Sequence, residues 1–106
     1  MIGIPKEEEW TPMYIIRESF VAKPGMASKL AQLFKEAAPS LFGSKTRVMT
    51  DAVAAFNTVV IETEVSELAE FERIMKEYGE RKEIRDRFKG YTDLWISGGR
   101  EIYRVV

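Results

Sequence analysis

The sequence contains neither cysteine nor histidine among its 106 residues. Without cysteine there is no disulfide framework, no thiol nucleophile and no thiolate metal site, which suits a reducing compartment. Without histidine there is no Ser-His-Asp or Cys-His arrangement, and the usual ligand of haem, zinc and non-haem iron is missing. We therefore expect a protein whose own side chains hold no metal and no cofactor.

Long apolar runs and an excess of one charge are also missing. The 17 acidic and 16 basic side chains leave a net charge of -1, with no basic stripe of the kind that nucleic acid demands. No stretch approaches the ~20 apolar residues that cross a bilayer. The N-terminus carries Glu7-Glu8-Glu9 where a signal peptide would be basic and then apolar. We expect a cytoplasmic protein that binds neither nucleic acid nor a membrane.

What the sequence does contain is the material for one small domain. Apolar residues make up 45% of the chain and charged residues 31%, and a chain of this length supports a single core. Residues 1–12 include two prolines, a glycine and three consecutive glutamates, so we expect an N-terminal arm there. Residues 13–106 are predicted to form the domain.

Four segments are rich in the β-branched and aromatic residues that favour strands. They are residues 13–22, 46–53, 58–64 and 100–106. A turn at Asn57 is predicted to join the second and third strands into a hairpin, because Asn tolerates turn conformations. Gly98-Gly99 is predicted to introduce the last strand, which places Trp95 in an irregular link before it.

Two stripes of apolar residues at spacings of three and four predict helices. The first begins near Met26, and Pro39 is predicted to end or kink it. The second has Ser66 as its N-cap and Gly79 just past its end. Residues 80–89 are predicted to form a further, thin helix that is mostly exposed.

The order β-α-β-β-α-β predicts an α+β, ferredoxin-like domain. Its four-stranded antiparallel sheet would carry the helices on one face only. The other face is predicted to present Val, Ile, Tyr and Phe, and an uncovered apolar sheet is a liability in a monomer. We therefore expect two copies to pair face to face as a dimeric α/β barrel.

Three segments resemble the dimeric α/β-barrel superfamily, and within it the NIPSNAP-like and antibiotic-biosynthesis-monooxygenase-like small proteins. They are Arg17 with Lys23-Pro24-Gly25, residues 59–64 with Ser66-Glu67-Leu68, and residues 98–105. The resemblance implies a homodimer with a ligand cavity between sheet and helices. Activities known in the superfamily include cofactor-independent oxygenation of aromatic polyketides, haem degradation and stress-related roles. The missing histidine departs from the haem-binding branch, where an imidazole is the usual axial ligand.

A cavity in that place would need apolar walls and a few polar side chains. The candidate ligand-binding residues are Tyr14, Phe34, Arg47, Asp51, Glu62 and Trp95. Among them Glu62 or Asp51 is a candidate base, because a carboxylate beside an apolar cavity can have a raised pKa. Four strand carboxylates qualify by position for such a role, and they are Glu18, Asp51, Glu62 and Glu64. The alternative is that each of them faces solvent or forms an ordinary cross-strand ion pair with Arg17, Arg47, Arg100 or Arg104.

Three functions are open at this point. The first is a homodimeric protein that binds an apolar or aromatic small molecule. The second is a cofactor-independent monooxygenase acting on a phenolic or quinol-like substrate, and the third is a structural or regulatory dimer without a ligand. The presence of a cavity separates the first two from the third.

Overall fold

The computed structural model describes residues 13–106, so the predicted arm at residues 1–12 lies outside the described part. Four antiparallel strands form one sheet with the order β2-β3-β1-β4. They are β1 (Tyr14–Ala22), β2 (Thr46–Thr50), β3 (Thr58–Val65) and β4 (Trp95–Arg104). This is the predicted ferredoxin-like sheet, in which the first and third strands are central.

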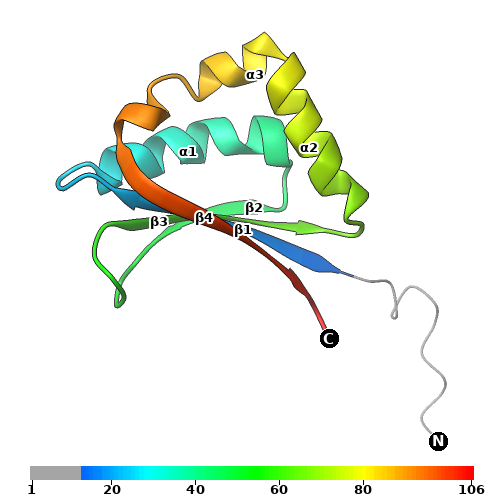
Figure 1. The fold of residues 1–106 in the computed structure, drawn as a ribbon, viewed down its shortest axis with the longest axis horizontal. Helices are drawn as coiled ribbons and strands as arrows, with labels where there is room; N and C mark the ends of the chain where they lie inside the picture. The colour runs from blue at the N-terminus through cyan, green and yellow to red at the C-terminus, as the bar shows by residue number, and fades with distance from the viewer. Residues whose placement is uncertain (1–12) are drawn as a thin grey trace, which may run out of the picture.

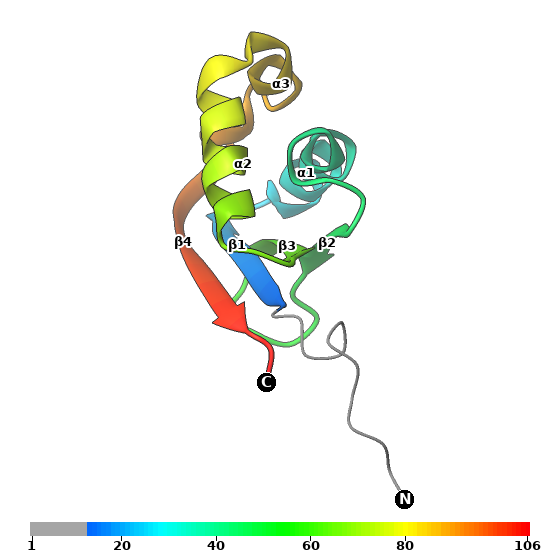
Figure 2. The same ribbon diagram turned by 90° about the vertical axis from the view of Figure 1, so that its right-hand side faces the viewer.

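The helices lie together on one face of the sheet (Figure 1). They are α1 (Ala27–Phe42), α2 (Ala69–Glu80) and α3 (Lys82–Arg87), followed by a short 3₁₀ turn at Tyr91–Asp93. Turned by 90°, the chain shows α1 lying over β2 and β3, whereas α2 rises on the side of β4 (Figure 2). Within the described residues, no helix has the length and apolar content needed to span a membrane.

The core forms between the sheet and the helices because both contribute apolar residues at the period of their element. From α1 come Leu30 and Phe34, which are 0% and 1% exposed, and from the central strands come Ile16 and Val59. The predicted thin helix also contributes, since Ile84 is buried against the same cluster.

Helix α1 continues through Pro39 to Phe42, so Pro39 does not end the helix, and the other alternative, a kink at this residue, stays a prediction. A proline inside a helix removes one hydrogen bond and crowds the preceding turn. Here Pro39 is exposed, and Leu41 and Phe42 beyond it are buried. Burial of these two side chains outweighs the local cost of the proline, and the helix ends at Gly43, whose φ is 91°.

The predicted ends of the second helix are also wrong. The N-cap of α2 is Leu68 rather than Ser66, and Gly79 lies inside the helix rather than beyond it. Leu68 makes no capping hydrogen bond through its side chain. Acidic residues in the first turn, Glu70 and Glu72, instead complement the positive end of the helix dipole.

Strand β4 begins at Trp95, so Trp95 is not in an irregular link and Gly98 lies within the strand. The register pairs Phe20 with Gly98. A Cβ atom at Gly98 would lie 2.7 Å from the carbonyl oxygen of Ser19, closer than real Cβ atoms come. Glycine is therefore required for β4 to approach β1 at this point, and it is not a turn signal.

The face of the sheet away from the helices is only in part the apolar surface that we predicted. Residues paired directly across the strands share a face, and Arg17, Glu62 and Arg47 form a charged row across its centre. Apolar side chains surround the row, and they are Ile15, Val21, Met49, Val60 and Tyr103. The expected phenylalanine is absent, because Phe20 points to the helix side and packs on Phe34.

Candidate functional site

A pocket of about 230 Å³ lies between the helix-covered face of the sheet and the helices. Its lining combines nine apolar or aromatic side chains with one carboxylate and one guanidinium. The lining residues are Glu18, Phe20, Phe34, Leu41, Phe42, Ile61, Met75, Tyr78, Phe88, Tyr91 and Arg100. We refer to it below as the sheet–helix pocket.

Aromatic rings from four parts of the chain build one side of the sheet–helix pocket. Phe20 of β1 lies 4.8 Å from Phe34 of α1, centroid to centroid, and 5.5 Å from Trp95 at the start of β4. Tyr91 stacks on Trp95 at 6.4 Å with an angle of 10° between the planes. The ring of Phe88 packs against both Phe34 and Tyr91. Because each ring packs against at least one other ring, the aromatic side chains hold one another in position on this side of the pocket.

The polar part of the pocket is an ion pair between neighbouring strands. Glu18 and Arg100 are register partners on β1 and β4, and the Arg100 Nε–H donates a hydrogen bond to Glu18 Oε1. Glu18 is only 8% exposed. The guanidinium reaches towards α2, where it lies 4.8 Å from the centroid of Phe71 and 3.6 Å from the Met75 sulfur.

Tyr91 adds a hydroxyl to the same pocket. Burial raises its pKa to about 12, and the neighbouring Tyr78 hydroxyl and the charge on Glu18 act in the same direction. At neutral pH Tyr91 is therefore protonated, so it can donate a hydrogen bond to a ligand but cannot act as a base there.

A second hollow of about 300 Å³ opens along β4 and shares a wall with the sheet–helix pocket. Glu18, Phe20, Tyr91 and Arg100 line both, and Trp95, Ser19, Gly98 and Gly99 complete the second one. The ion pair therefore lies between an aromatic interior and a more open groove. The indole Nε1 of Trp95 is buried and has no hydrogen-bond partner among the described residues.

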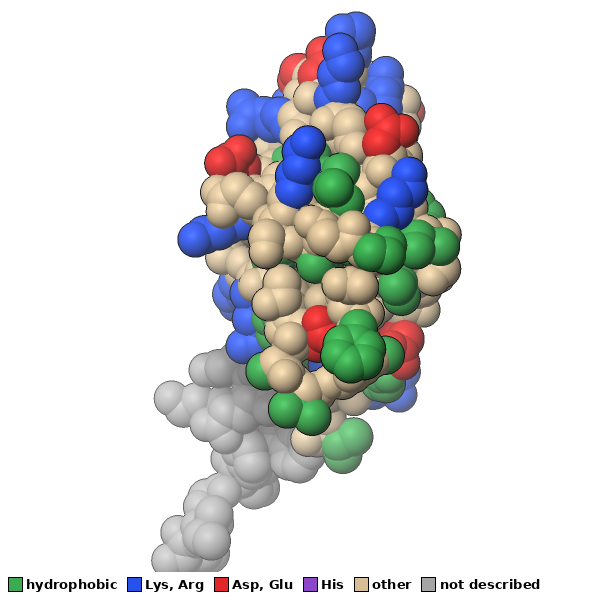
Figure 3. All heavy atoms as spheres, turned by 90° about the vertical axis from the view of Figure 1, so that its left-hand side faces the viewer, with side chains coloured by type: hydrophobic (Ala, Val, Ile, Leu, Met, Phe, Trp, Pro, Cys, Tyr) green, Lys and Arg blue, Asp and Glu red, His purple; other side chains and the backbone are tan. Residues whose placement is uncertain are grey.

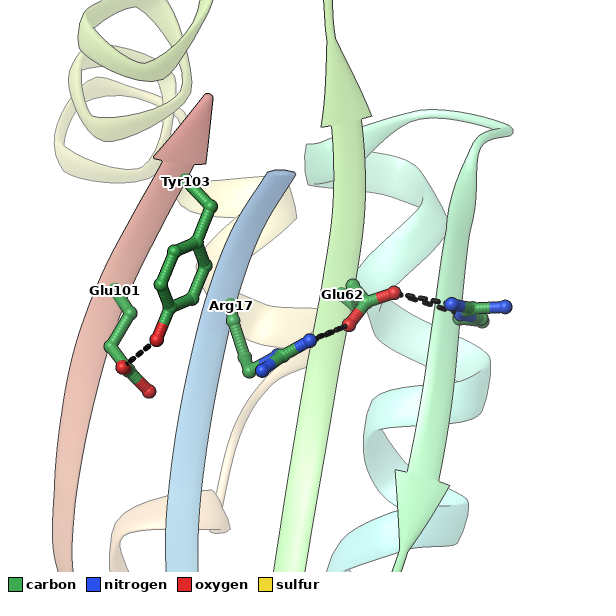
Figure 4. A network of polar contacts seen from close by, with 5 residues as sticks. Arg17, Glu62, Glu101 and Tyr103 are labelled. Carbon is green, nitrogen blue, oxygen red and sulfur yellow. Dashed lines mark hydrogen bonds and ion pairs between the residues drawn. The ribbon is translucent and has the colours of Figure 1, made fainter. Parts of the chain in front are cut away.

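On the opposite face of the sheet, Glu62 accepts hydrogen bonds from two arginines (Figure 4). Arg17 Nη2 lies 2.8 Å from Glu62 Oε2, and Arg47 Nη2 lies 2.5 Å from Oε1. Burial alone would raise the pKa of Glu62, but the hydrogen bonds from Arg47 and Arg17 outweigh it and hold that pKa below its usual range. Glu62 is therefore a structural ion-pair partner, and it is poorly suited to act as a base.

Tyr103 and Glu101 lie beside this charged row on β4. The Tyr103 hydroxyl donates a hydrogen bond to Glu101, and the guanidinium of Arg17 lies 5.5 Å from the centroid of the Tyr103 ring (Figure 4). The row and its neighbours thus form one connected polar network on the uncovered face.

The structure does not bring the six predicted ligand-binding residues to one place. Phe34 lines the sheet–helix pocket and Trp95 lines the groove next to it. Tyr14 lies 5.7 Å beneath the Arg104 guanidinium, away from both. Arg47 and Glu62 lie on the uncovered face. Asp51 accepts a hydrogen bond from the Thr58 amide at 3.0 Å and so closes the β2–β3 turn.

Sequence reasoning missed the polar residues that do line the pocket. The alternative that strand carboxylates pair with arginines across the sheet is confirmed for Glu62 and for Glu18. The six predicted ligand-binding residues, however, do not include the polar side chains of the pocket lining, which are Glu18, Tyr78, Tyr91 and Arg100. The signal that could have found the ion pair was the register, since an antiparallel β1–β4 pair with Gly98 opposite Phe20 places Arg100 opposite Glu18.

Two other features do not make a better site. A hollow of about 430 Å³ at the far end of the sheet is lined mainly by exposed or charged residues such as Lys45, Glu64 and Arg73. Within residues 13–106 there is also no group of three or more acidic, histidine or cysteine side chains placed to hold a metal ion.

Comparison with known proteins rests on structure, since no protein-family model and no curated protein matches the sequence. A NIPSNAP family protein of unknown function from Agrobacterium tumefaciens superposes with a TM-score of 0.76 at 12% identity, covering 88% of this chain and 87% of its own. The chain has the ferredoxin-like fold of NIPSNAP proteins. The likeness predicted from the sequence is thereby confirmed at the level of the fold.

Two further structures extend the comparison beyond the NIPSNAP group. A candidate antibiotic biosynthesis monooxygenase from Chloroflexus aurantiacus has a TM-score of 0.67 at 17% identity, covering 89% of this chain and 93% of its own. A dimeric protein of unknown function with a ferredoxin-like fold, from Bacteroides fragilis, has a TM-score of 0.63 at 16% identity, covering 88% and 96%. At these identities the likeness to NIPSNAP and related structures establishes the fold alone.

Proposed function

We propose that this protein is a homodimer that binds an apolar or aromatic small molecule in the sheet–helix pocket. The observation that carries the proposal is the pocket itself, which has aromatic walls and one ion pair between the buried Glu18 and the partly exposed Arg100. Pockets of this composition, mostly apolar with a few convergent polar groups, are typical of small-molecule sites.

The size of the pocket limits the ligand. Its volume of about 230 Å³ lies below the roughly 300–1,000 Å³ of sites that hold drug-sized molecules. A single aromatic ring with a small substituent fits such a space, and a longer ligand would extend past Tyr91 into the groove along β4.

The test is titration of the protein with p-cresol, followed by NMR of backbone amides. We expect saturable shifts at residues of the pocket, such as Phe34, Phe88 and Tyr91. Met75→Phe places a bulkier side chain at the pocket wall and should weaken binding at least tenfold. Met26→Phe is the matched control, because Met26 is exposed and does not line the pocket.

Two results would refute binding in this place. One is the absence of saturable shifts with p-cresol up to its solubility limit, which would favour the third function, a structural or regulatory dimer without a ligand. The other is equal weakening by Met75→Phe and Met26→Phe, which would show that the ligand lies elsewhere.

The homodimer is proposed through the uncovered face of the sheet. This face carries apolar residues around the row formed by Arg17, Glu62 and Arg47, and in that row Glu62 accepts hydrogen bonds from both arginines. A buried carboxylate with two hydrogen-bonded arginines tolerates removal from water better than an unpaired charge does. The Bacteroides fragilis structure with the same fold is described as dimeric.

The shape of the chain supports the same contact. The β2–β3 turn and the end of β4 both curve to the side away from the helices (Figure 1). The turn carries Val53 and Phe56, which are 98% and 87% exposed. In the view of the end of the molecule that includes this turn, hydrophobic side chains lie in the lower part with acidic ones among them, and lysines and arginines lie in the upper part and along the edges (Figure 3).

Light scattering at micromolar concentration tests the dimer. We expect twice the 12.2 kDa mass of the chain. Val60→Asp puts a charge on the uncovered face, since Val60 pairs with Met49 and Ser19 there, and should give the monomer mass. Leu68→Asp, a charge at an exposed apolar position by α2, should leave the dimer intact. A monomeric wild-type chain would disprove this part of the proposal.

A cofactor-independent monooxygenase is the second candidate, and the pocket is again the reason. In such a reaction a phenolic or quinol-like substrate supplies the electrons, one oxygen atom enters the product and the other leaves as water. The protein provides an aromatic slot with a hydrogen-bond donor and an acceptor, and Tyr91 and Glu18 offer these. Stoichiometric oxygen uptake with hydroquinone, lost in Glu18→Gln, would support it. Oxygen uptake no faster than in buffer without protein would refute the monooxygenase and leave ligand binding as the only proposed function.

A further inference from the structure

We infer that the sheet–helix pocket selects neutral ligands that carry a hydrogen-bond donor next to an acceptor, such as an aromatic carboxamide, and discriminates against aromatic carboxylates. This inference rests on the proposed binding function and names its ligand class. It depends on the ion pair between Glu18 and Arg100, which is the charged feature of the pocket.

The ion pair leaves hydrogen-bonding capacity unused. Only Glu18 Oε1 and Arg100 Nε take part in the bond between them. Among the described residues, Glu18 Oε2 makes no hydrogen bond, and the guanidinium, which lies over the Phe71 ring, donates only one further hydrogen bond, from Nη2 to the Met75 sulfur. A carboxylate oxygen accepts and a guanidinium N–H donates. A ligand group with one N–H or O–H beside one oxygen complements both.

The pair also fixes the net charge of the pocket. Glu18 contributes one negative charge and Arg100 one positive charge, and the other lining residues are not Asp, Glu, Lys or Arg. A neutral ligand keeps the pocket neutral. A carboxylate would place a second negative charge beside the 8% exposed Glu18, among aromatic walls that do not solvate it.

Removing the negative charge of Glu18 should therefore reverse the preference for neutral ligands over carboxylates. In Glu18→Gln the side chain keeps its size and an acceptor oxygen, but Arg100 is left as an unpaired cation at the pocket wall. Arg100 is partly exposed, with 43% of its side chain accessible, so the variant does not bury a lone charge completely. The positive pocket should then favour a carboxylate.

The experiment compares three probes of similar size, benzamide, benzoate and toluene, by NMR titration of the full chain at neutral pH. For the wild-type protein we expect benzamide to bind at least tenfold more tightly than benzoate and more tightly than toluene. In Glu18→Gln benzoate should gain at least tenfold and become the tightest of the three. Arg100→Lys keeps the positive charge but loses the planar guanidinium with its several N–H donors. It should therefore reduce the ratio of the benzamide affinity to the toluene affinity, and it should not make benzoate the tightest ligand.

Glu64→Gln is the matched control, because Glu64 is an exposed carboxylate on β3 that does not line the pocket. It should leave all three affinities unchanged. If benzamide and toluene bind equally well, or if benzoate binds best to the wild-type protein, the inference is wrong while the proposed binding function stands. If none of the probes binds at the pocket, the proposed function itself fails.

Discussion

Phe34 is the residue on which core and pocket both depend. It is 1% exposed, and its ring lies 4.8–6.1 Å, centroid to centroid, from the rings of Phe20, Phe88 and Tyr91. The same side chain thus fills the space between α1 and the sheet and supplies part of the pocket wall. A large change there cannot affect binding without affecting stability.

Phe34→Ala should lower the free energy of unfolding by about 3–5 kcal/mol, because it removes a buried ring and leaves a cavity. Urea denaturation followed by circular dichroism measures this. The neighbouring Lys35→Ala is the control, since Lys35 is exposed and should change stability by less than about 0.5 kcal/mol. A loss below about 1 kcal/mol for Phe34→Ala would mean that the core does not depend on this ring.

Glu62 gives a prediction about pH. Burial would raise its pKa, but the hydrogen bonds from Arg47 and Arg17 hold that pKa below its usual range, so the native state favours the ionised form. A carboxyl group whose pKa is lower in the folded than in the unfolded chain stabilises the native state at pH values above its unfolded pKa. This stabilisation is lost as the pH falls through the folded pKa. Both arginines are more than a third exposed, so solvent screening keeps the contribution small.

Glu62→Gln should therefore lower the free energy of unfolding by about 1–2 kcal/mol at pH 7. The difference from the wild-type protein should shrink as the pH falls below about 4. Denaturant titrations at several pH values measure it, with Glu64→Gln as the exposed neighbour for comparison. A difference that stays constant down to pH 3 would show that the ionised carboxylate does not carry the effect.

At the scale of elements, the pairing of β4 with β1 decides which side chains meet in the pocket. The strands pair from Tyr14 with Arg104 to Val21 with Ser97, and a bulge follows before Ala22 pairs with Trp95. This register places Arg100 opposite Glu18. Displacement of β4 by one residue would move Arg100 to the other face of the sheet.

Gly98→Ala should disturb this pairing. Its Cβ would lie 2.7 Å from the Ser19 carbonyl oxygen, so the two strands must move apart, at a cost of about 1–3 kcal/mol. Gly99→Ala is the control, since a Cβ there meets nothing within 4 Å. Thermal unfolding compares the two variants. Equal melting temperatures would mean that the close approach of β4 to β1 at Gly98 does not require glycine. Because the shift of β4 moves Arg100, we also expect benzamide to bind more weakly to Gly98→Ala than to the wild-type protein, whereas Gly99→Ala should leave benzamide binding unchanged.

At the scale of the whole molecule, one sheet separates two environments. The helix side holds the aromatic core and the sheet–helix pocket, and the uncovered side holds the row of Arg17, Glu62 and Arg47. The proposed ligand and the proposed second copy would therefore occupy opposite faces.

The lack of histidine and cysteine gives a prediction for the molecule as a whole. Haem added to the protein should produce no stoichiometric Soret band, and Zn²⁺ should not raise the melting temperature, since neither imidazole nor thiolate ligands are present. Difference spectroscopy and thermal unfolding with and without EDTA measure these effects. A sharp one-to-one haem spectrum would contradict the prediction.

The sequence by itself determined the order and type of the elements, because hydrophobic periodicity is a local property. The stripes in 26–41 and 68–78 and the alternation in β1 and β3 were sufficient to predict the βαββαβ fold. Element ends were less accurate. Pro39 and Gly79 are local signals for ending a helix, and in both places burial of neighbouring residues or continued helical hydrogen bonding prevailed.

The tertiary structure alone decided which charged residues meet. Four strand carboxylates look alike in sequence, yet the register gives Glu62 two arginines on the uncovered face and gives Glu18 one arginine beside an aromatic pocket. Residues 82 positions apart, such as Glu18 and Arg100, have no local signal that joins them. Their contact depends on how β4 closes against β1, and that depends on packing across the whole sheet.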